Sequence, residues 1–115
     1  MLEKREFYIN GEWVSPAKPN DSHVIDPTTE EPCAVISLGD QADTDAAVAA
    51  AKAALPGWMA TPPAERIALL EKLLEVYQAR AEDLAKAMST AMGAPMDLAR
   101  TSQVGAGSYH LSNFI

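Results

Sequence analysis

The chain has 115 residues, of which 48% are hydrophobic, and 9 basic against 16 acidic side chains give it a net charge of −7. This length falls in the range of one small domain, and the acidic balance repels phosphate backbones, which excludes nucleic acid as a partner. No apolar run approaches the ~20 residues that cross a bilayer, so a membrane-spanning helix is excluded as well.

The start of the chain lacks the cationic region and apolar core of a secretory signal. The single cysteine, Cys33, cannot form an internal disulfide, which agrees with a reducing compartment. We therefore expect a cytoplasmic protein with no membrane partner.

Residues 1–40 predict short strands, because β-branched and aromatic residues lie between prolines. The runs that predict strands are Tyr8-Ile9, Trp13-Val14, His23-Val24-Ile25 and Ala34-Val35-Ile36. Asn10-Gly11 between the first two runs predicts a hairpin, since a type I′ turn needs positive φ at both central residues. With a second turn expected at residues 27–31, the region forms two β-ribbons too small to be stable alone.

From residue 43 the apolar period becomes that of a helix. Asp43 or Asp45 is the expected N-cap. The expected apolar face consists of Val48, Ala51, Leu55 and Trp58. Pro56-Gly57 is expected to end or distort this helix in its last turn.

A second helix is expected to start at Thr61-Pro62-Pro63, where the threonine hydroxyl caps free amides and the prolines occupy positions that need no donor. Its apolar face begins with Leu70, Leu73, Leu74 and Tyr77. The same rhythm continues to Met92, giving about thirty residues where helices average ~11 to 12. The sequence therefore predicts a break at residues 80–82.

Gly93-Ala94-Pro95 ends the helical run, and a last segment starts at Met96 or Asp97. Glycines at 105 and 107 weaken that segment as a helix by ~1 kcal/mol each relative to alanine. Gly105-Ala106-Gly107 does not predict a dinucleotide loop, because it follows no predicted strand and lacks the third glycine.

None of the reactive side chains is expected to serve in catalysis, cofactor binding or metal binding, because the residues next to them in the sequence do not support such a role. Cys33 has no adjacent base or cation to activate a thiolate, which favours a half-buried strand residue. His23 and His110 have no second ligand at helical or hairpin spacing. Asp43 and Asp45 favour a role at the positive end of a helix dipole.

Several stretches, taken in order, resemble the N-terminal segment of NAD(P)-dependent aldehyde dehydrogenases. They are Tyr8-Ile9-Asn10-Gly11-Glu12-Trp13, Ile25-Asp26-Pro27-Thr28-Thr29-Glu30, Asp43-Thr44-Asp45-Ala46-Ala47-Val48 with Trp58, Pro63-Ala64-Glu65-Arg66 with Leu69-Leu70, and Met92-Gly93-Ala94-Pro95. Each stretch alone is a weak signal, whereas the ordered set is specific. The resemblance implies an α/β parent fold. Residues 1–115 would be the N-terminal part of its cofactor-binding domain, an α+β segment with β-ribbons in 1–40 and helices in 41–115, and the catalytic domain would be absent.

The chain departs from the family pattern at several positions. Asp26 stands where asparagine is usual, and Ala94 replaces a common lysine. Ala91 stands where the family often has an acidic residue, which helps to hold a monovalent cation together with backbone carbonyls near Val24 and Ile25. Alanine offers no anionic oxygen, so the resemblance leaves only the carbonyls of Val24 and Ile25 as weak cation ligands, and no other metal is expected.

The resemblance implies an oxidoreductase that oxidises an aldehyde to a carboxylic acid through a cysteine thiohemiacetal and passes the hydride to NAD or NADP. It also implies a homo-oligomer, either a dimer or a tetramer. Neither catalytic nor cofactor-binding residues are expected within residues 1–115, so the isolated chain should be inactive and bind no cofactor. In the family, the helix matching residues 103–110 borders the substrate tunnel, which makes Ala106 and Gly107 candidate tunnel residues. Plain helix packing is the alternative for both.

A second hypothesis is a stand-alone, non-catalytic α+β remnant that acts as an interaction or packing module on a full-length relative. Whether the coding frame extends past Ile115 discriminates between the two hypotheses.

Overall fold

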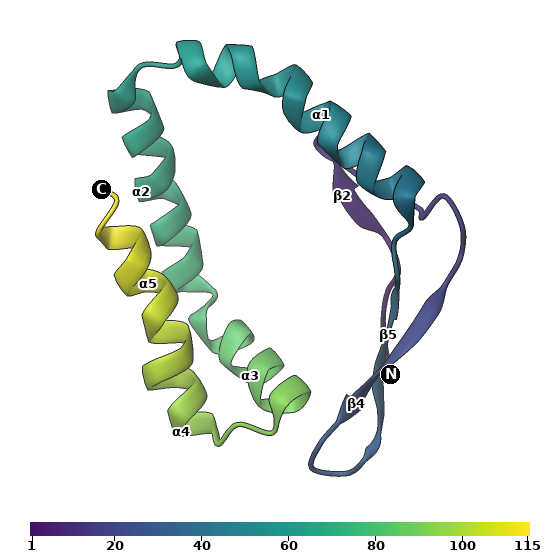
Figure 1. The fold of residues 1–115 in the computed structure, drawn as a ribbon. Helices are drawn as coiled ribbons and strands as arrows, with labels where there is room; N and C mark the ends of the chain where they lie inside the picture. The colour runs from purple at the N-terminus through teal and green to yellow at the C-terminus, as the bar shows by residue number, and fades with distance from the viewer. The chain divides into compact units, whose positions relative to one another are not determined.

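The structure, a computed structural model, describes all 115 residues. The chain divides into two compact units, one made of residues 1–25 and 30–60 and the other of residues 26–29 and 61–115. Strands come first along the chain and helices follow (Figure 1). None of the helices combines the length and the apolar character that crossing a membrane would require.

The first unit contains the strands. Their bounds are β1 (Leu2–Lys4), β2 (Phe7–Ile9), β3 (Glu12–Val14), β4 (Asp21–Asp26) and β5 (Glu31–Ser37). β2 and β3 form an antiparallel hairpin in which Tyr8 lies opposite Trp13. Asn10 and Gly11 between them have φ values of 55° and 83°, as a type I′ turn requires. The hairpin prediction is therefore confirmed.

The other strands form a three-stranded sheet in the order β1-β5-β4. Residues 27–30 make the turn between β4 and β5, which confirms the second predicted turn. β1 was not predicted, because Leu2-Glu3-Lys4 has no apolar alternation. It pairs in parallel with β5, with Glu3 opposite Val35. β1 is thus a strand because the edge of β5 offers it hydrogen bonds, and its own three residues give no sign of this.

Helix α1 (Gln41–Ala60) has a different N-cap from the predicted one. Asp40 Oδ1 accepts the backbone amides of Ala42 at 2.8 Å and Asp43 at 3.2 Å. The prediction of Asp43 or Asp45 as the N-cap is therefore wrong, because free amides are capped by a carboxylate two or three residues before them. Asp43 instead lies in the first turn.

Pro56 does not end α1, which continues through it to Ala60. The predicted apolar face of α1 stays uncovered, since Leu55 and Trp58 are 50% and 48% exposed. The helical period of this stretch is confirmed, and Leu55 and Trp58 stay half-exposed.

The second unit contains the other helices. Their bounds are α2 (Pro63–Ala79), α3 (Ala81–Met92), α4 (Met96–Leu98), the π-helical segment η1 (Ala99–Gln103) and α5 (Val104–Ser112). Arg80 separates α2 from α3, which confirms the predicted break. Gly93 ends α3 in the left-handed conformation with a φ of 69°, which confirms the predicted stop. The N-cap of α2 is Pro62 rather than the predicted Thr61.

Small side chains form the core of the second unit. The buried residues are Ala85, Ala94, Ala99 and Val104. Around them pack Tyr77, Ala81, Leu84, Met88 and Met96. Alanine lets helix backbones approach closely, so this unit is held by close helix contacts more than by large buried side chains.

Candidate functional site

The predicted tunnel residues Ala106 and Gly107 lie in the first turn of α5, where Ala106 is exposed and Gly107 is half-buried. The turn that leads into α5 is π-helical, because the amide of Val104 donates to the carbonyl of Ala99, five residues earlier. A π turn holds more residues than an α turn and so changes the phase of the helix that follows. The π turn thus helps to decide which side of α5 faces α2.

Gly107 lies in close contact with Tyr77 of α2. A Cβ atom placed on Gly107 would lie 2.6 Å from Cζ of Tyr77 and closer still to its hydroxyl oxygen. Real Cβ atoms essentially never approach other atoms within 3.0 Å. Only glycine therefore fits between α5 and the tyrosine ring as they stand, which favours the helix-packing alternative for Gly107.

The Tyr77 ring is held in this place by a hydrogen bond. Its hydroxyl donates to the carbonyl oxygen of Val104 at 2.9 Å, across 27 positions of sequence. Val104 is 4% exposed, so the bond joins α2 to a buried part of α5. The sequence had shown Tyr77 only as one member of an apolar helix face, and no spacing signal could have linked it to a residue so far along the chain.

Of the two carbonyl groups expected as weak cation ligands, the one of Val24 takes part in a hydrogen bond. The carbonyl oxygen of Val24 on β4 accepts a hydrogen bond from the Cys33 thiol, with 3.4 Å between sulfur and oxygen. Ile25 follows it with an exposed side chain. Ala91 lies exposed near the end of α3. Nowhere in the chain do three or more His, Cys, Asp or Glu side chains gather so as to hold a metal ion.

Asp43 is a buried carboxylate that forms hydrogen bonds with backbone amides. It accepts the backbone amides of Ala17 at 2.8 Å and of Asp40 at 3.0 Å. These bonds, the one from Ala17 foremost, hold the pKa of Asp43 below its ordinary value. The ionised side chain thus ties the loop before β4 to the start of α1, and no base, nucleophile or cation accompanies it in its hydrogen bonds.

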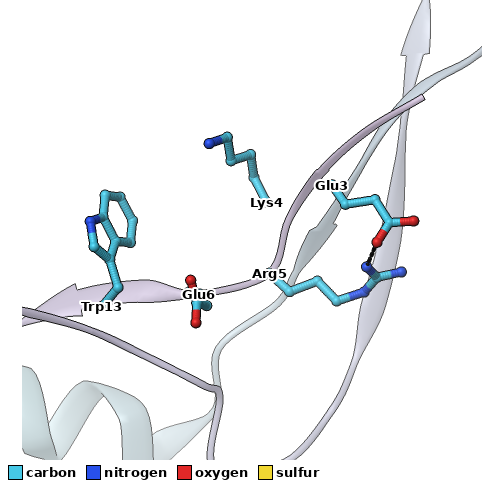
Figure 2. Close-up of a pocket in the computed structure, with 5 residues that line it drawn as sticks. All are labelled: Glu3, Lys4, Arg5, Glu6 and Trp13. Carbon is cyan, nitrogen blue, oxygen red and sulfur yellow. Dashed lines mark hydrogen bonds and ion pairs between the residues drawn. The ribbon is translucent and has the colours of Figure 1, made fainter.

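A cavity of about 250 Å³ lies beside the N-terminal strands, and Figure 2 shows the residues that line it. Its lining residues are Glu3, Lys4, Arg5, Glu6 and Trp13. Arg5 turns toward Glu3 and away from Trp13, and it also pairs with Asp21 at 2.9 Å. Hydrogen bonds to Asp21 and then Glu3 raise the pKa of Arg5 above its ordinary value. Two acidic and two basic side chains line the cavity, so its lining carries no net formal charge.

Comparison with known proteins places the chain in a family. Residues 13–114 match the aldehyde dehydrogenase family. The 3-succinoylsemialdehyde-pyridine dehydrogenase of a Pseudomonas species is 40% identical over 111 residues, which make up 96% of this chain and 23% of that enzyme.

Solved structures agree with the sequence match. The crystal structure of an aldehyde dehydrogenase from Bartonella henselae matches with a TM-score of 0.97 and 53% identity, over 98% of this chain and 24% of that one. A mutant of aldehyde dehydrogenase C from Pseudomonas syringae, complexed with NAD+ and octanal, matches with a TM-score of 0.92 and 41% identity, over 94% of this chain and 22% of that one. The chain spans about a quarter of the length of these relatives. By this agreement of sequence and fold over nearly all its residues, the chain belongs to the aldehyde dehydrogenase family.

Proposed function

We propose that residues 1–115 form the N-terminal part of the cofactor-binding domain of an enzyme that oxidises an aldehyde to a carboxylic acid with NAD or NADP. The observation that carries the proposal is the match to the Bartonella henselae enzyme, with a TM-score of 0.97 at 53% identity. The Pseudomonas syringae relative, which is 41% identical, was crystallised with NAD+ and octanal, and this supports a nicotinamide cofactor and an aldehyde as ligands.

The residues of this chain do not fit a cofactor site by themselves. Dinucleotide phosphates bind where a glycine-rich turn follows a strand and opens a helix. β5 is followed by α1, but the carboxylate of Asp40 already accepts the free amides there, and the Asp43 carboxylate beside it would also repel phosphate. Gly105 lies inside α5 rather than after a strand. In this proposal the groups that bind NAD(P) and the catalytic cysteine lie outside residues 1–115.

Within this chain, the proposed contribution to the active site is a wall of the substrate path. Ala106 is the stronger candidate because it is exposed on α5 and carries only a methyl group. Gly107 faces Tyr77 and supports the wall from behind. A small side chain at position 106 leaves room for the substrate beside α5.

To test the proposal, two proteins are expressed separately: the product of the complete coding frame that includes these residues, and the 115-residue chain. We expect the longer protein to reduce NAD or NADP when an aldehyde is added, and the 115-residue chain to show neither turnover nor NAD binding by titration calorimetry. Cys33→Ala should retain the activity of the longer protein, because Cys33 is bonded to a strand carbonyl and has no base beside it. Turnover by the 115-residue chain that is abolished in Cys33→Ala would contradict the proposal.

A second candidate is a non-catalytic packing module that associates with a full-length relative. The exposed apolar face of α1 favours it, since Leu55 and Trp58 lie half-exposed in this chain. A cellular product whose mass corresponds to 115 residues alone would support this candidate against the enzyme.

For the enzyme, we further propose a homo-oligomer, a dimer or a tetramer, in the cytoplasm. The single unpaired cysteine agrees with a reducing compartment. Light scattering on the purified complete protein measures the oligomeric state. A monomer at working concentration would overturn the proposal of a homo-oligomer.

A further inference from the structure

We infer that Tyr77 and Gly107 are positioning residues that set where α5 presents Ala106, and thereby which aldehydes the enzyme accepts. The inference rests on the proposed function, in which Ala106 borders the substrate path. Tyr77 and Gly107 influence the position of Ala106 through α5, the helix that carries Ala106.

The first step is that the α2–α5 contact allows no extra atom. α5 lies against α2 (Figure 1). A methyl group at position 107 overlaps the Cζ atom and the hydroxyl of Tyr77. The overlap is relieved either by moving α5 or by turning the ring, and turning the ring breaks its hydrogen bond to Val104. The first response displaces α5, and the second removes the bond that ties its first residue, Val104, to α2.

The second step is that this disturbance reaches Ala106. Neighbouring helix residues lie 1.5 Å apart along the axis and about 100° apart around it, so Ala106 projects from a different side of α5 than Gly107. A helix moves as a rigid element, because its hydrogen bonds fix the neighbouring residues to one another. A displacement at position 107 is thus carried to the exposed face at position 106, although no atom of Tyr77 has to touch the substrate.

The same helix offers a matched control. A Cβ atom at Gly105 meets no atom within 4 Å outside the helix itself. Gly105→Ala therefore makes the same chemical change two residues earlier without the overlap. Any difference between the two variants reports the contact with Tyr77 and not the helix propensity of alanine.

The experiment uses the complete enzyme and a series of straight-chain aldehydes of increasing length. The variants are Gly107→Ala, Gly105→Ala, Tyr77→Phe and the double variant Gly107→Ala with Tyr77→Leu. For each, kcat and KM are measured along the series, and a melting curve verifies that the protein is folded. Leucine lacks the ring atoms that overlap an added Cβ, so the double variant tests rescue.

We expect the ratio of kcat/KM between long and short aldehydes to change by about 10-fold or more in Gly107→Ala, in line with the effect of a methylene-sized change in a pocket. It should stay unchanged in Gly105→Ala and return toward the wild-type value in the double variant. Tyr77→Phe, which keeps the ring but loses the hydrogen bond, should shift the ratio in the same sense by less. If Gly107→Ala does not fold, Tyr77→Phe becomes the decisive variant.

A loss of kcat/KM by the same factor for every aldehyde would assign Tyr77 and Gly107 a purely structural role and overturn the inference. An equal shift in Gly105→Ala would overturn it too. These outcomes differ from a failure of the proposed function, in which the wild-type protein oxidises no aldehyde at all and the inference falls with it.

Discussion

At the scale of single residues, Asp43 connects segments that the sequence separates. Its carboxylate accepts an amide from Ala17 in the loop before β4 and another from Asp40 at the start of α1. Asp40 in turn accepts the amide of Asp43, so the two aspartates form a reciprocal cap in the manner of a capping box. The loop and the helix start are thereby held by charge-assisted hydrogen bonds.

We predict that stability falls in acid through Asp43. The pKa of Asp43 is lower in the folded state than its ordinary value of 3.8, because the Ala17 and Asp40 amides favour the ionised form. The folded state therefore binds its proton less readily than the unfolded chain. The stabilisation is present above the ordinary pKa and is lost as the pH falls through the folded value.

Denaturant melts of the complete protein from about pH 5 downward measure this loss. Asp43→Asn should be less stable at neutral pH and show a flatter acid dependence. Asp45→Asn, at an exposed position two residues later in the same helix, is the matched control. An unchanged slope in Asp43→Asn would show that other carboxylates govern the acid response.

We predict that the same glycine-to-alanine change has opposite signs at two positions. Neither Gly11 nor Gly57 has an atom within 4 Å of an added Cβ, so backbone conformation alone decides. Gly11 has a φ of 83°, where an L-residue is strained by roughly 1–2 kcal/mol. Gly57 lies in α1, where alanine is favoured by roughly 0.5–1 kcal/mol.

Urea unfolding of both variants, made in the complete protein, measures the two changes in free energy. Gly11→Ala should lower and Gly57→Ala raise the midpoint. Equal signs would mean that the left-handed conformation of the hairpin turn is not required by the fold.

At the scale of elements, α1 tolerates a proline that ought to break it. Pro56 supplies no amide to the helix ladder and crowds the carbonyl four residues before it, yet the helix runs on to Ala60. Alanines at many of the preceding positions give the helix enough propensity to continue.

We predict that Pro56→Ala stabilises α1 by up to about 3 kcal/mol, the usual disadvantage of proline in a helix interior. Far-UV circular dichroism should show more helix and a later thermal midpoint. Lys52→Ala one turn earlier is the control, because it changes an exposed side chain without restoring a backbone donor. A lower helix content in Pro56→Ala would mean that the proline stabilises α1 through contacts.

At the scale of the whole molecule, few large side chains are buried. No large side chain of the chain is less than 2% exposed, and most of the buried apolar residues are alanines. Trp13, Met59 and Phe114 are 64%, 70% and 75% exposed. Exposed apolar side chains of this size favour association when they form a contiguous patch.

We predict that the 115-residue chain expressed alone self-associates or is partly molten, because its apolar faces gain free energy by leaving water. Size-exclusion chromatography with light scattering and dye binding to exposed apolar surface measure both. A monodisperse monomer with one sharp cooperative melt would contradict this. Leu55→Glu on the exposed face of α1 should reduce association, whereas Lys52→Glu on the same helix should not.

Several elements have local causes, and these could be predicted from the sequence. Asn10-Gly11 predicted the hairpin because only a few residue types adopt positive φ, and Gly93 predicted the end of α3 for the same reason. The break at Arg80 followed from helix length, and the ordered motifs pointed to the family that the comparisons confirm. The turn and helix-end residues lie within a few positions of the elements that they specify.

The pairings between distant residues depend on how the whole chain packs. β1 is a strand because the edge of β5 offers it hydrogen bonds, and Tyr77 meets Val104 and Gly107 because α2 and α5 pack side by side. The N-cap Asp40 was missed because competing aspartates follow within a few positions and only backbone geometry selects among them. Periodicity shows which face of a helix is apolar, but the partner of that face is chosen by the packing of the whole chain, to which contacts far apart in sequence contribute most.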